Sequence, residues 1–315
     1  MAAKVFIDGE AGTTGLQIRD RLSGRRDIEL LSVAHDRRKE LSARADAINA
    51  ADLVILCLPD AAARESVSLI DNSHTRVIDA STAHRTAAGW VYGFPELAAG
   101  QGAAIAQAAR VSNPGCWPTG FLALVRPLVD AGIVPADWPL SVHGVSGYTG
   151  GGRAMITQFE DGASPDHTDT AYRIYAANLH HKHLPEMQHH AGLTRTPLFT
   201  PAVGRFAQGM IVEAPLPLAA LPKSPSLSDV YGILSAAYQN ARFVEVATRS
   251  EVATLSGLEA EAMAGQNGMK LFVFGADDLG QARLVAALDN LGKGAAGAAV
   301  QNLNLMLGFD EGAGL

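Results

Sequence analysis

Cysteine, positive charge and long apolar runs are all in short supply in this 315-residue sequence. Its two cysteines, Cys57 and Cys116, do not make a disulfide scaffold, and we therefore expect a reducing, cytoplasmic compartment. Acidic residues outnumber basic ones by 32 to 25, and the net charge of −7 argues against nucleic acid or an anionic membrane as the main partner. No apolar run approaches the roughly 18–20 residues that span a bilayer. The N-terminus leads into a strand pattern without the architecture of a signal peptide.

What the sequence does contain is enough apolar material for a large core. The hydrophobic fraction of 48% is ordinary for a soluble enzyme, and 315 residues suffice for two domains. We expect residues 1–115 to form an α/β dinucleotide-binding domain, against which a C-terminal helix within residues 290–315 packs back. Residues 116–289 show strand-like runs with few helices, and they predict an α+β domain whose largely antiparallel sheet carries the substrate site. These runs are Leu140–Val145, Thr200–Val203, Gly209–Ala214, Phe243–Val246, Leu271–Ala276 and Ala282–Leu288.

A short apolar strand, Lys4–Asp8, runs directly into a glycine turn and then into a helix pattern. This order suits the pyrophosphate of a dinucleotide, because glycines let the backbone approach phosphate and a helix N-terminus supplies N–H groups and dipole. The spacing is GxxGxxG rather than GxGxxG, so a simple strand-to-helix turn is the alternative. The candidate cofactor-binding residues are Gly9, Gly12, Thr13, Thr14 and Gly15.

Charged residues follow the second expected strand, Ile28–Val33. In such folds an acidic residue at this strand end holds the adenosine ribose, whereas basic residues accept a 2′-phosphate. Asp36 would suit NAD, but Arg37, Arg38 and the lysine after them favour NADP. A solvated run of charges is the alternative.

Two more strands are expected at Asp52–Leu58 and Arg76–Asp79. The continuous apolar character of the first suits a parallel strand buried on both faces, and Cys57 within it belongs to the core. Polar residues gather after the carboxyl end of the second strand, where open α/β sheets bind ligands. Ser81 is our candidate for the cofactor site there.

The most informative stretch, Asn113-Pro114-Gly115-Cys116-Trp117-Pro118, joins the two expected domains. It predicts a turn and then a helix from Cys116 to about Val129, because proline is tolerated in a first helical turn. That geometry directs free N–H groups and the positive end of the helix dipole at the Cys116 sulfur, which favours the nucleophilic thiolate. The alternative is a buried apolar cysteine.

A glycine-rich stretch, His143–Arg153, predicts a loop that ends in one arginine. Such a loop can wrap a small anionic ligand, with Arg153 binding phosphate or carboxylate through two N–H groups. A flexible surface loop is the alternative. The candidate substrate-binding residues are Asn113, Ser146 and Arg153.

Five histidines fall within His180–His190. A histidine close to a thiol can activate it and serve as general acid–base, and the candidates are His181 and His183. Pro185 marks a helix start, so Glu186 lies in the first turn and could orient an imidazole. A metal site is the competing interpretation, but the HExxH spacing of a zinc helix is absent and we expect no metal.

Four motifs, in order along the chain, resemble those of the compact N-acetyl-gamma-glutamyl-phosphate reductases. Asn113–Thr119 resembles the nucleophile motif NPGCYPT, and His181–Glu186 resembles the segment HRHxPEI. Tyr92–Leu97 is similar to YGLPEL, and Lys293–Asn304 to KGASGQAVQNMN. The likeness extends from Gly9 to Asn304, and its departures are Phe94, Trp117 and Lys182.

This resemblance implies a semialdehyde dehydrogenase-like fold with a Rossmann-type NADP-binding domain, assembled as a homo-oligomer, either dimer or tetramer. The implied reaction is the NADPH-dependent reduction of N-acetyl-L-glutamyl 5-phosphate to the 5-semialdehyde, in arginine biosynthesis. Cys116 would attack the acyl phosphate and form a thioester. His181 or His183 would act as acid–base with Glu186 as orienting partner, and Asn302 would lie at the nicotinamide end of the cofactor.

Other functions remain open at this point. Aspartate-semialdehyde dehydrogenase shares the implied fold and cysteine chemistry, and an aminoadipate-type reductase would act on a carrier-bound acyl phosphate. A catalytically silent dinucleotide sensor would use the first domain alone. For the C-terminal stretch of small residues, 290–306, the plain alternative is a packing helix.

Overall fold

The computed structural model describes residues 2–315 and divides the chain into two compact units. Unit 1 comprises the residues up to Pro95 together with Gly100–Gly115 and Ala295–Leu315. Unit 2 comprises Glu96–Ala99 and Cys116–Gly294. The chain therefore passes from one unit to the other four times, and the short excursion at Glu96–Ala99 belongs to unit 2 although both of its flanks belong to unit 1.

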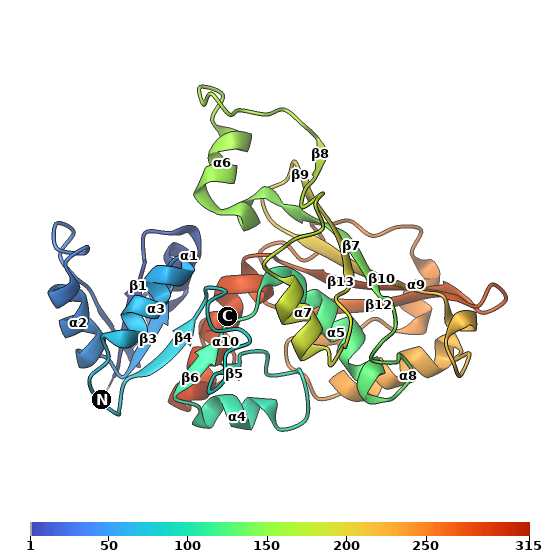
Figure 1. Ribbon diagram of the computed structural model, residues 1–315, viewed down its shortest axis with the longest axis horizontal. Helices are drawn as coiled ribbons and strands as arrows, with labels where there is room; N and C mark the ends of the chain where they lie inside the picture. The colour runs from blue at the N-terminus through green and yellow to red at the C-terminus, as the bar shows by residue number, and fades with distance from the viewer. Residues whose placement is uncertain (1) are drawn as a thin grey trace. The chain divides into compact units, whose positions relative to one another are not determined.

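Unit 1 is built on one parallel sheet (Figure 1). Its six strands lie in the order β2-β1-β3-β4-β6-β5, and each of these pairings is parallel. The strands are β1 (Ala3–Asp8), β2 (Ile28–Leu31), β3 (Leu53–Leu56), β4 (Arg76–Asp79), β5 (Val91–Tyr92) and β6 (Arg110–Ser112). The helices are α1 (Thr13–Leu22), α2 (Leu41–Ala50), α3 (Asp60–Ser68), α4 (Gln101–Gln107) and α10 (Gly297–Leu307).

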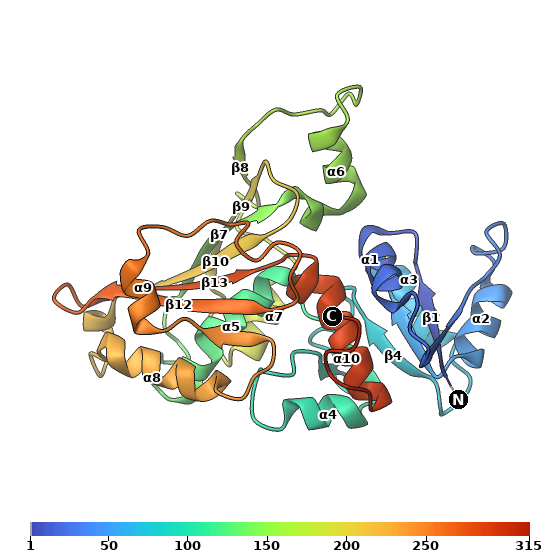
Figure 2. The same ribbon diagram turned by 180° about the vertical axis from the view of Figure 1, so that it is seen from behind.

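Apolar side chains cover both faces of this sheet, because successive residues of a strand point to opposite sides. On one face Val5 shares a core with α1, α4 and α10, through residues such as Ile18 and Val300. On the other face Phe6 shares a core with α2 and α3, Ile48 among them. The last helix, α10, thus completes the core of unit 1, beside β4 in Figure 2.

The four strands that the sequence predicts in this unit are confirmed, each to within two residues at either end. The two further strands, β5 and β6, contain two and three residues and were not expected. A strand this short has no alternating pattern by which it could be recognised.

Unit 2 is built on a seven-stranded sheet in the order β11-β12-β13-β10-β7-β9-β8. The pairs β11–β12 and β7–β9 are parallel and the other four are antiparallel, so the largely antiparallel sheet is confirmed. The strands are β7 (Ser141–Gly147), β8 (Tyr172–Ile174), β9 (Leu198–Gly204), β10 (Met210–Leu216), β11 (Val244–Val246), β12 (Met269–Ala276) and β13 (Gln281–Leu288).

Helix α5 (Cys116–Asp130) packs against β10, β12 and β13 in both views (Figures 1 and 2). A Cβ atom at Gly120 would lie only 2.8 Å from the side chain of Val212, so the glycine permits close approach of helix and sheet. The other helices are α6 (Gly152–Glu160), α7 (Leu184–His190), α8 (Leu227–Tyr238) and α9 (Arg249–Thr254), with short turns η1 (Tyr148–Gly151) and η2 (Leu218–Ala220) and a π-helix, η3 (Gly292–Ala296). Across residues 2–315, none of the helices has both the length and the apolar character needed to cross a bilayer.

Unit 2 contains more helix than the sequence predicts. The 12-residue helix α8 begins at a capping box, in which the Ser226 hydroxyl accepts from the Asp229 N–H and the Asp229 carboxylate accepts from the Ser226 N–H. Ser-x-x-Asp before an apolar run is a readable helix start, so this signal was present in the sequence and was missed.

Candidate active site

Cys116 is the first residue of α5 and follows the Asn113–Gly115 turn directly. The helix ends at Asp130, one residue beyond the expected end, and Pro118 lies in its first turn as predicted. Cys116 is partly buried and, within residues 2–315, forms no disulfide. Because the first N–H groups of a helix have no partners within it, they and the helix dipole favour the thiolate form of a cysteine at this position.

Cys57 is a different kind of cysteine. It follows β3, and burial raises the pKa of its thiol to about 12, with further contributions from the carboxylates of Asp79 and Asp8. At neutral pH the Cys57 thiol is therefore protonated and a poor nucleophile. This agrees with its interpretation as a core residue and leaves Cys116 as the candidate nucleophile.

His181 and His183 lie together just before α7, with ring centroids 4.7 Å apart. Nδ1 of His181 accepts a hydrogen bond from the His183 backbone N–H at 3.2 Å. Burial, helped by the charge of Lys182, lowers the pKa of His181 to about 4, so this ring is neutral at physiological pH. With Nδ1 acting as acceptor, the neutral ring carries its proton on Nε2 and can donate it as a hydrogen bond.

Tyr175 interacts with both His181 and Cys116. Its ring centroid lies 5.8 Å from that of His181. Burial raises the pKa of its hydroxyl, and so does electrostatic interaction with Cys116, whereas a hydrogen bond with Trp117 acts in the opposite direction. Sequence reasoning missed Tyr175, because it lies in an irregular segment with no local pattern.

The backbone between Tyr175 and His181 is strained. Ala176 and Leu179 have φ angles of 52° and 60°, in the left-handed region that costs energy for residues other than glycine. Such conformations persist where the surrounding structure fixes them, and they recur at functional sites. The strain therefore marks the segment that carries Tyr175 and His181.

Glu186 lies in the first turn of α7 after Pro185, as predicted, and is 1% exposed. Its role in orienting an imidazole stays a prediction. Four of the nearby histidines form two ring pairs, His181–His183 and His189–His190, with centroids 4.7 and 4.8 Å apart. Within residues 2–315 no three His, Cys, Asp or Glu side chains are arranged as the ligands of a metal ion.

The glycine-rich stretch is not a loop, which corrects the sequence interpretation. β7 continues through Ser146 to Gly147, and η1 leads into α6 at Gly152. Ser146 is 5% exposed, whereas Arg153 is exposed in the first turn of α6. A Cβ at Gly147 would lie 2.4 Å from the carbonyl oxygen of Ala207, so the glycine is needed for close packing of two backbones rather than for loop flexibility.

Close backbone packing requires glycines in the GxxGxxG turn of unit 1, and its role as a pyrophosphate site stays a prediction. Gly9 has a φ of +92°, and a Cβ there would lie 2.4 Å from the Cys57 carbonyl oxygen. A Cβ at Gly15 would lie 2.6 Å from the Gly9 carbonyl oxygen. Gly12 precedes Thr13, the first residue of α1, so the backbone N–H groups at the N-terminus of this helix lie at the turn.

A pocket of about 340 Å³ adjoins this turn, and only one of the two arginine candidates lines it. Arg38 and Lys39 line the pocket. Arg37 does not, and its guanidinium instead forms an exposed ion pair with Glu40 at 2.9 Å. The structure thus places one of the two predicted arginines at the pocket and the other on the surface.

Arg44, from α2, also lines this pocket and was missed in the sequence. Its guanidinium is buried between Asp8 at 3.0 Å and the Ser66 hydroxyl at 2.6 Å, with Glu65 at 3.0 Å. Desolvation acts against its charge, yet the hydrogen bonds to Asp8 and Glu65 raise its pKa overall. The sequence could not reveal this position, since the partners of Arg44 lie in β1 and α3, outside its own helix.

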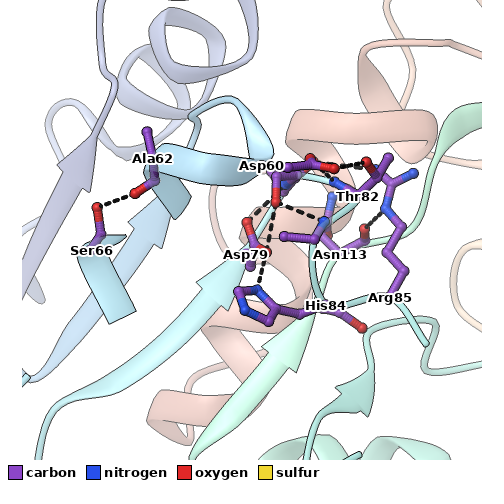
Figure 3. Close-up of polar contacts among 12 residues, drawn as sticks. Asp60, Ala62, Ser66, Asp79, Thr82, His84, Arg85 and Asn113 are labelled. Atoms are coloured by element: carbon purple, nitrogen blue, oxygen red, sulfur yellow. Dashed lines mark hydrogen bonds and ion pairs between the residues drawn. The ribbon is translucent and has the colours of Figure 1, made fainter. Parts of the chain in front are cut away.

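A hydrogen-bond network surrounds the carboxyl end of β4 (Figure 3). The buried Asp79 carboxylate accepts from the Ser81 N–H and hydroxyl at 2.9 and 2.8 Å, and contacts Nδ1 of His84 at 2.6 Å. The His84 ring stacks on Trp90, with centroids 4.1 Å apart. Ser81 is therefore held in place, and Asp79 and His84 are the partners that sequence reasoning missed.

The same network reaches the turn before the nucleophile. The Asn113 N–H donates to the Asp79 carbonyl at 2.7 Å, and Arg85 donates to the Asn113 carbonyl at 3.0 Å (Figure 3). The Asn302 amide donates to Asn113 Oδ1 at 3.0 Å and to the Gly93 carbonyl at 2.8 Å. Asn302 Oδ1 is buried and lacks a hydrogen-bond partner, so it can accept from an N–H group of a ligand such as the nicotinamide carboxamide.

Two family models match the chain. Residues 4–105 match the semialdehyde dehydrogenase NAD binding domain, and residues 116–290 match the semialdehyde dehydrogenase dimerisation domain. N-acetyl-gamma-glutamyl-phosphate reductases of Brucella ovis and Brucella canis are each 56% identical over 309 residues, covering 98% of this chain and 100% of theirs. The chain belongs to the N-acetyl-gamma-glutamyl-phosphate reductase family. The resemblance drawn from four motifs is thereby confirmed.

The fold of this reductase is shared with aspartate semialdehyde dehydrogenases. A probable aspartate-semialdehyde dehydrogenase from Pseudomonas aeruginosa has a TM-score of 0.73 at 16% identity, covering 98% of this chain and 99% of that chain. Aspartate semialdehyde dehydrogenase II of Vibrio cholerae has a TM-score of 0.71 at 14% identity, covering 98% of each chain. At such identities the likeness shows the fold alone.

The four family motifs occupy defined places in the reductase structure. Asn113–Thr119 forms the turn and the first residues of α5, and His181–Glu186 leads into α7. Tyr92–Leu97 begins in β5 and ends in the excursion into unit 2, and Lys293–Asn304 spans η3 and most of α10. Two of the motifs thus supply candidate catalytic side chains, whereas Tyr92–Leu97 and the start of Lys293–Asn304 supply no candidate.

Proposed function

We propose that this reductase converts N-acetyl-L-glutamyl 5-phosphate to N-acetyl-L-glutamate 5-semialdehyde, with consumption of NADPH and release of phosphate, in arginine biosynthesis. The observation that carries the proposal is the 56% identity over 98% of the chain to named reductases of this activity. A cysteine at the start of α5 and the neutral His181 fit the acyl-transfer half of the reaction.

In the proposed reaction the Cys116 sulfur forms a bond to the C5 carbon, and the bond from C5 to the phosphate oxygen breaks. Phosphate leaves with that electron pair and takes up a proton. NADPH, when bound, supplies the hydride that reduces the resulting thioester. Cleavage of the carbon–sulfur bond then gives the aldehyde and restores the Cys116 thiolate, so the nucleophile is regenerated.

The side chains around Cys116 have separate proposed tasks. The backbone N–H groups at the start of α5 stabilise the oxyanion that forms at C5. His181 is the proposed acid–base group, and its Nε2–H donates to the same oxygen; His183 is the second candidate. Glu186 orients the imidazole pair from α7. Asn113, Ser146 and Arg153 are proposed substrate contacts, with Arg153 suited by charge to the departing phosphate.

The proposed cofactor contacts all lie in unit 1. The turn with Gly9, Gly12, Thr13, Thr14 and Gly15 receives the pyrophosphate at the α1 N-terminus. Arg38, supported by Lys39, binds the 2′-phosphate that distinguishes NADP from NAD. Ser81 and Asn302 lie toward the nicotinamide, and the buried Asn302 Oδ1 is the acceptor that fits its carboxamide.

We further propose that residues 1–115 with 290–315 bind the cofactor and that residues 116–289 carry catalysis and oligomerisation. The match of residues 116–290 to a dimerisation domain supports a homo-oligomer, either dimer or tetramer. The lack of a disulfide within residues 2–315 suits a cytoplasmic enzyme.

The test is the reverse reaction, oxidation of N-acetylglutamate semialdehyde with NADP and inorganic phosphate, followed by the absorbance of NADPH. We expect phosphate-dependent NADPH formation by the wild type and none by Cys116→Ser. Activity with aspartate semialdehyde instead, or with an aminoadipate-derived semialdehyde, would contradict the proposed substrate. NADP binding without turnover of any semialdehyde would favour a dinucleotide sensor.

A further inference from the structure

The segment Asp289–Gly294, here called the connector, follows β13 and includes the first three residues of η3, and it has no task in the proposed reaction. Its polar side chains are nevertheless almost fully buried, since Asp289, Asn290 and Lys293 are each 1% exposed. Asp289 Oδ1 accepts from the N–H groups of Leu291 at 2.7 Å and Gly292 at 2.9 Å. The connector is thus a fixed piece of backbone rather than a flexible link.

The connector holds a buried ion pair. The Lys293 ammonium lies 2.8 Å from both carboxylate oxygens of Glu96, and the two side chains are 2% and 7% exposed. The ring of Phe243 lies 5.7 Å from the same ammonium. Glu96 is the first residue of the short excursion Glu96–Ala99, so the pair ties this excursion to the connector within unit 2.

The residue after Lys293 is packed against the nucleophile. A Cβ at Gly294 would lie 2.8 Å from the Cys116 Cβ and 3.0 Å from the Asp289 carbonyl oxygen. Real Cβ atoms essentially never approach that closely, so the bare backbone of Gly294 forms one wall of the space that holds the Cys116 side chain. The ion pair and this wall are adjacent in the chain.

Stability alone does not explain a buried pair of charges. Taking both groups out of water costs about as much as their attraction returns, and apolar residues of similar volume often stabilise a fold as well or better. What a charged pair adds is a defined geometry, because the ammonium and the carboxylate must meet at one distance and orientation. A buried ion pair is therefore useful where a neighbouring group must be held in position to within a fraction of an ångström.

We propose that Lys293 and Glu96 are positioning residues, whose ion pair holds Gly294 against Cys116 and so fixes the sulfur at the N-terminus of α5. Neither residue touches the reacting atoms. This inference rests on the proposed role of Cys116 as nucleophile. It also gives a task to the two family motifs, Tyr92–Leu97 and Lys293–Asn304, that supply no candidate catalytic side chain.

The first test removes both charges at once, in Lys293→Met/Glu96→Leu. Because no unpaired charge is left buried, we expect a melting temperature close to that of the wild type. We expect kcat to fall about 10- to 100-fold, as for a small misplacement of a reacting group, with an unchanged KM for NADP. The single variant Glu96→Gln, which leaves the Lys293 charge unpaired, should also lower the melting temperature.

The second test reads the position of the sulfur directly, through alkylation of the Cys116 peptide by iodoacetamide as a function of pH. Moving the sulfur away from the helix N-terminus disfavours the thiolate, so the pH of half-maximal alkylation should rise in the double variant. Gly294→Ala should show the same rise and the same loss of kcat. Gly232→Ala is the matched control, since a Cβ there has no neighbour within 4 Å.

Wild-type kcat and an unmoved alkylation profile in both Lys293→Met/Glu96→Leu and Gly294→Ala would overturn the inference. A loss of kcat that only follows the unfolded fraction measured by circular dichroism, with an unmoved profile, would overturn it as well. Failure of the underlying function has a different signature, because Cys116→Ser would then remain active.

Discussion

Burial decides the charge of His181, and the charge decides what the ring can do. A histidine with its ordinary pKa would be partly protonated near neutral pH, whereas a pKa of about 4 keeps His181 neutral throughout the physiological range. In the proposed reaction the neutral ring leaves activation of the Cys116 thiolate to the helix N-terminus and offers Nε2–H as a hydrogen-bond donor. The proposal therefore separates activation of the sulfur from stabilisation of the oxyanion.

Replacing His181 by alanine removes that donor, and we expect kcat to fall about 10²- to 10³-fold, the usual loss for one oxyanion-stabilising group. His180→Ala is the control, since His180 is exposed in the same segment. Steady-state rates of semialdehyde oxidation give the comparison. Equal activity of His181→Ala and wild type would remove His181 from the reaction and favour His183.

The same histidine makes stability depend on pH. In the unfolded chain its pKa is the ordinary 6.5, and in the folded chain it is about 4, so the unfolded state binds more protons between these values. Stability should therefore fall as the pH drops from 6.5 towards 4. Urea unfolding at several pH values should show a shallower fall in His181→Ala than in the wild type, and parallel curves would contradict the lowered pKa.

Arg37 and Arg38 are adjacent in the chain but differ in their surroundings. Because Arg38 lines the pocket and Arg37 pairs with Glu40 on the surface, only Arg38 should contact the 2′-phosphate. We expect Arg38→Ala to raise the KM for NADP about 10- to 100-fold, the worth of a charge-assisted hydrogen bond, and to leave that for NAD unchanged. Arg37→Ala is the internal control, and a larger effect from it would reverse the assignment.

At the scale of elements, the turn between β1 and α1 has the least tolerance for change. Gly9→Ala combines a positive φ with a contact of 2.4 Å to a backbone oxygen, and we expect it to lower the free energy of unfolding by at least about 1–3 kcal/mol. Gly24→Ala separates the two causes, since Gly24 has a φ of +80° but no neighbour within 4 Å. Similar losses in both variants, measured by urea unfolding, would mean that the contact to Cys57 is unimportant.

Helices that begin at a proline or a glycine turn were predictable from the sequence. Prolines at 118 and 185 locate α5 and α7, and the glycine turn locates α1. The stretch Gly147–Gly152 shows the limit of this reasoning, because Gly147 is required by a backbone contact with residue 207 that no local pattern reveals. Composition alone therefore suggested a loop where the chain forms strand and helix.

The candidate site divides in the same way. The sequence predicts the positions of Cys116, His181 and Glu186, because each lies at or just before a recognisable helix start. Tyr175 and Arg44 do not, since each acquires its role from partners that are distant in the chain or outside its own element. What the sequence could not supply is the pairing of buried polar groups, which depends on packing rather than on spacing.

For the whole molecule, cofactor binding should be visible as stability. A ligand that binds only the folded state at 100 times its Kd adds about 2.7 kcal/mol to the free energy of unfolding. We expect NADP to raise the melting temperature of the wild type, and NAD at the same concentration to raise it less. Thermal scans of the wild type and of Arg38→Ala give the measurement, and an equal shift with both nucleotides would contradict the preference for NADP.

The return of α10 to unit 1 has a consequence for biosynthesis. The ribosome delivers the strands of the parallel sheet first and the whole of unit 2 next, and only then the residues that fill one face of that sheet, Val300 and Leu303 among them. A nascent chain therefore keeps an incomplete apolar face exposed until α10 has emerged, although N-terminal domains generally fold first. Chaperones that recognise such surfaces should engage this chain before α10 emerges and let go of it soon afterwards.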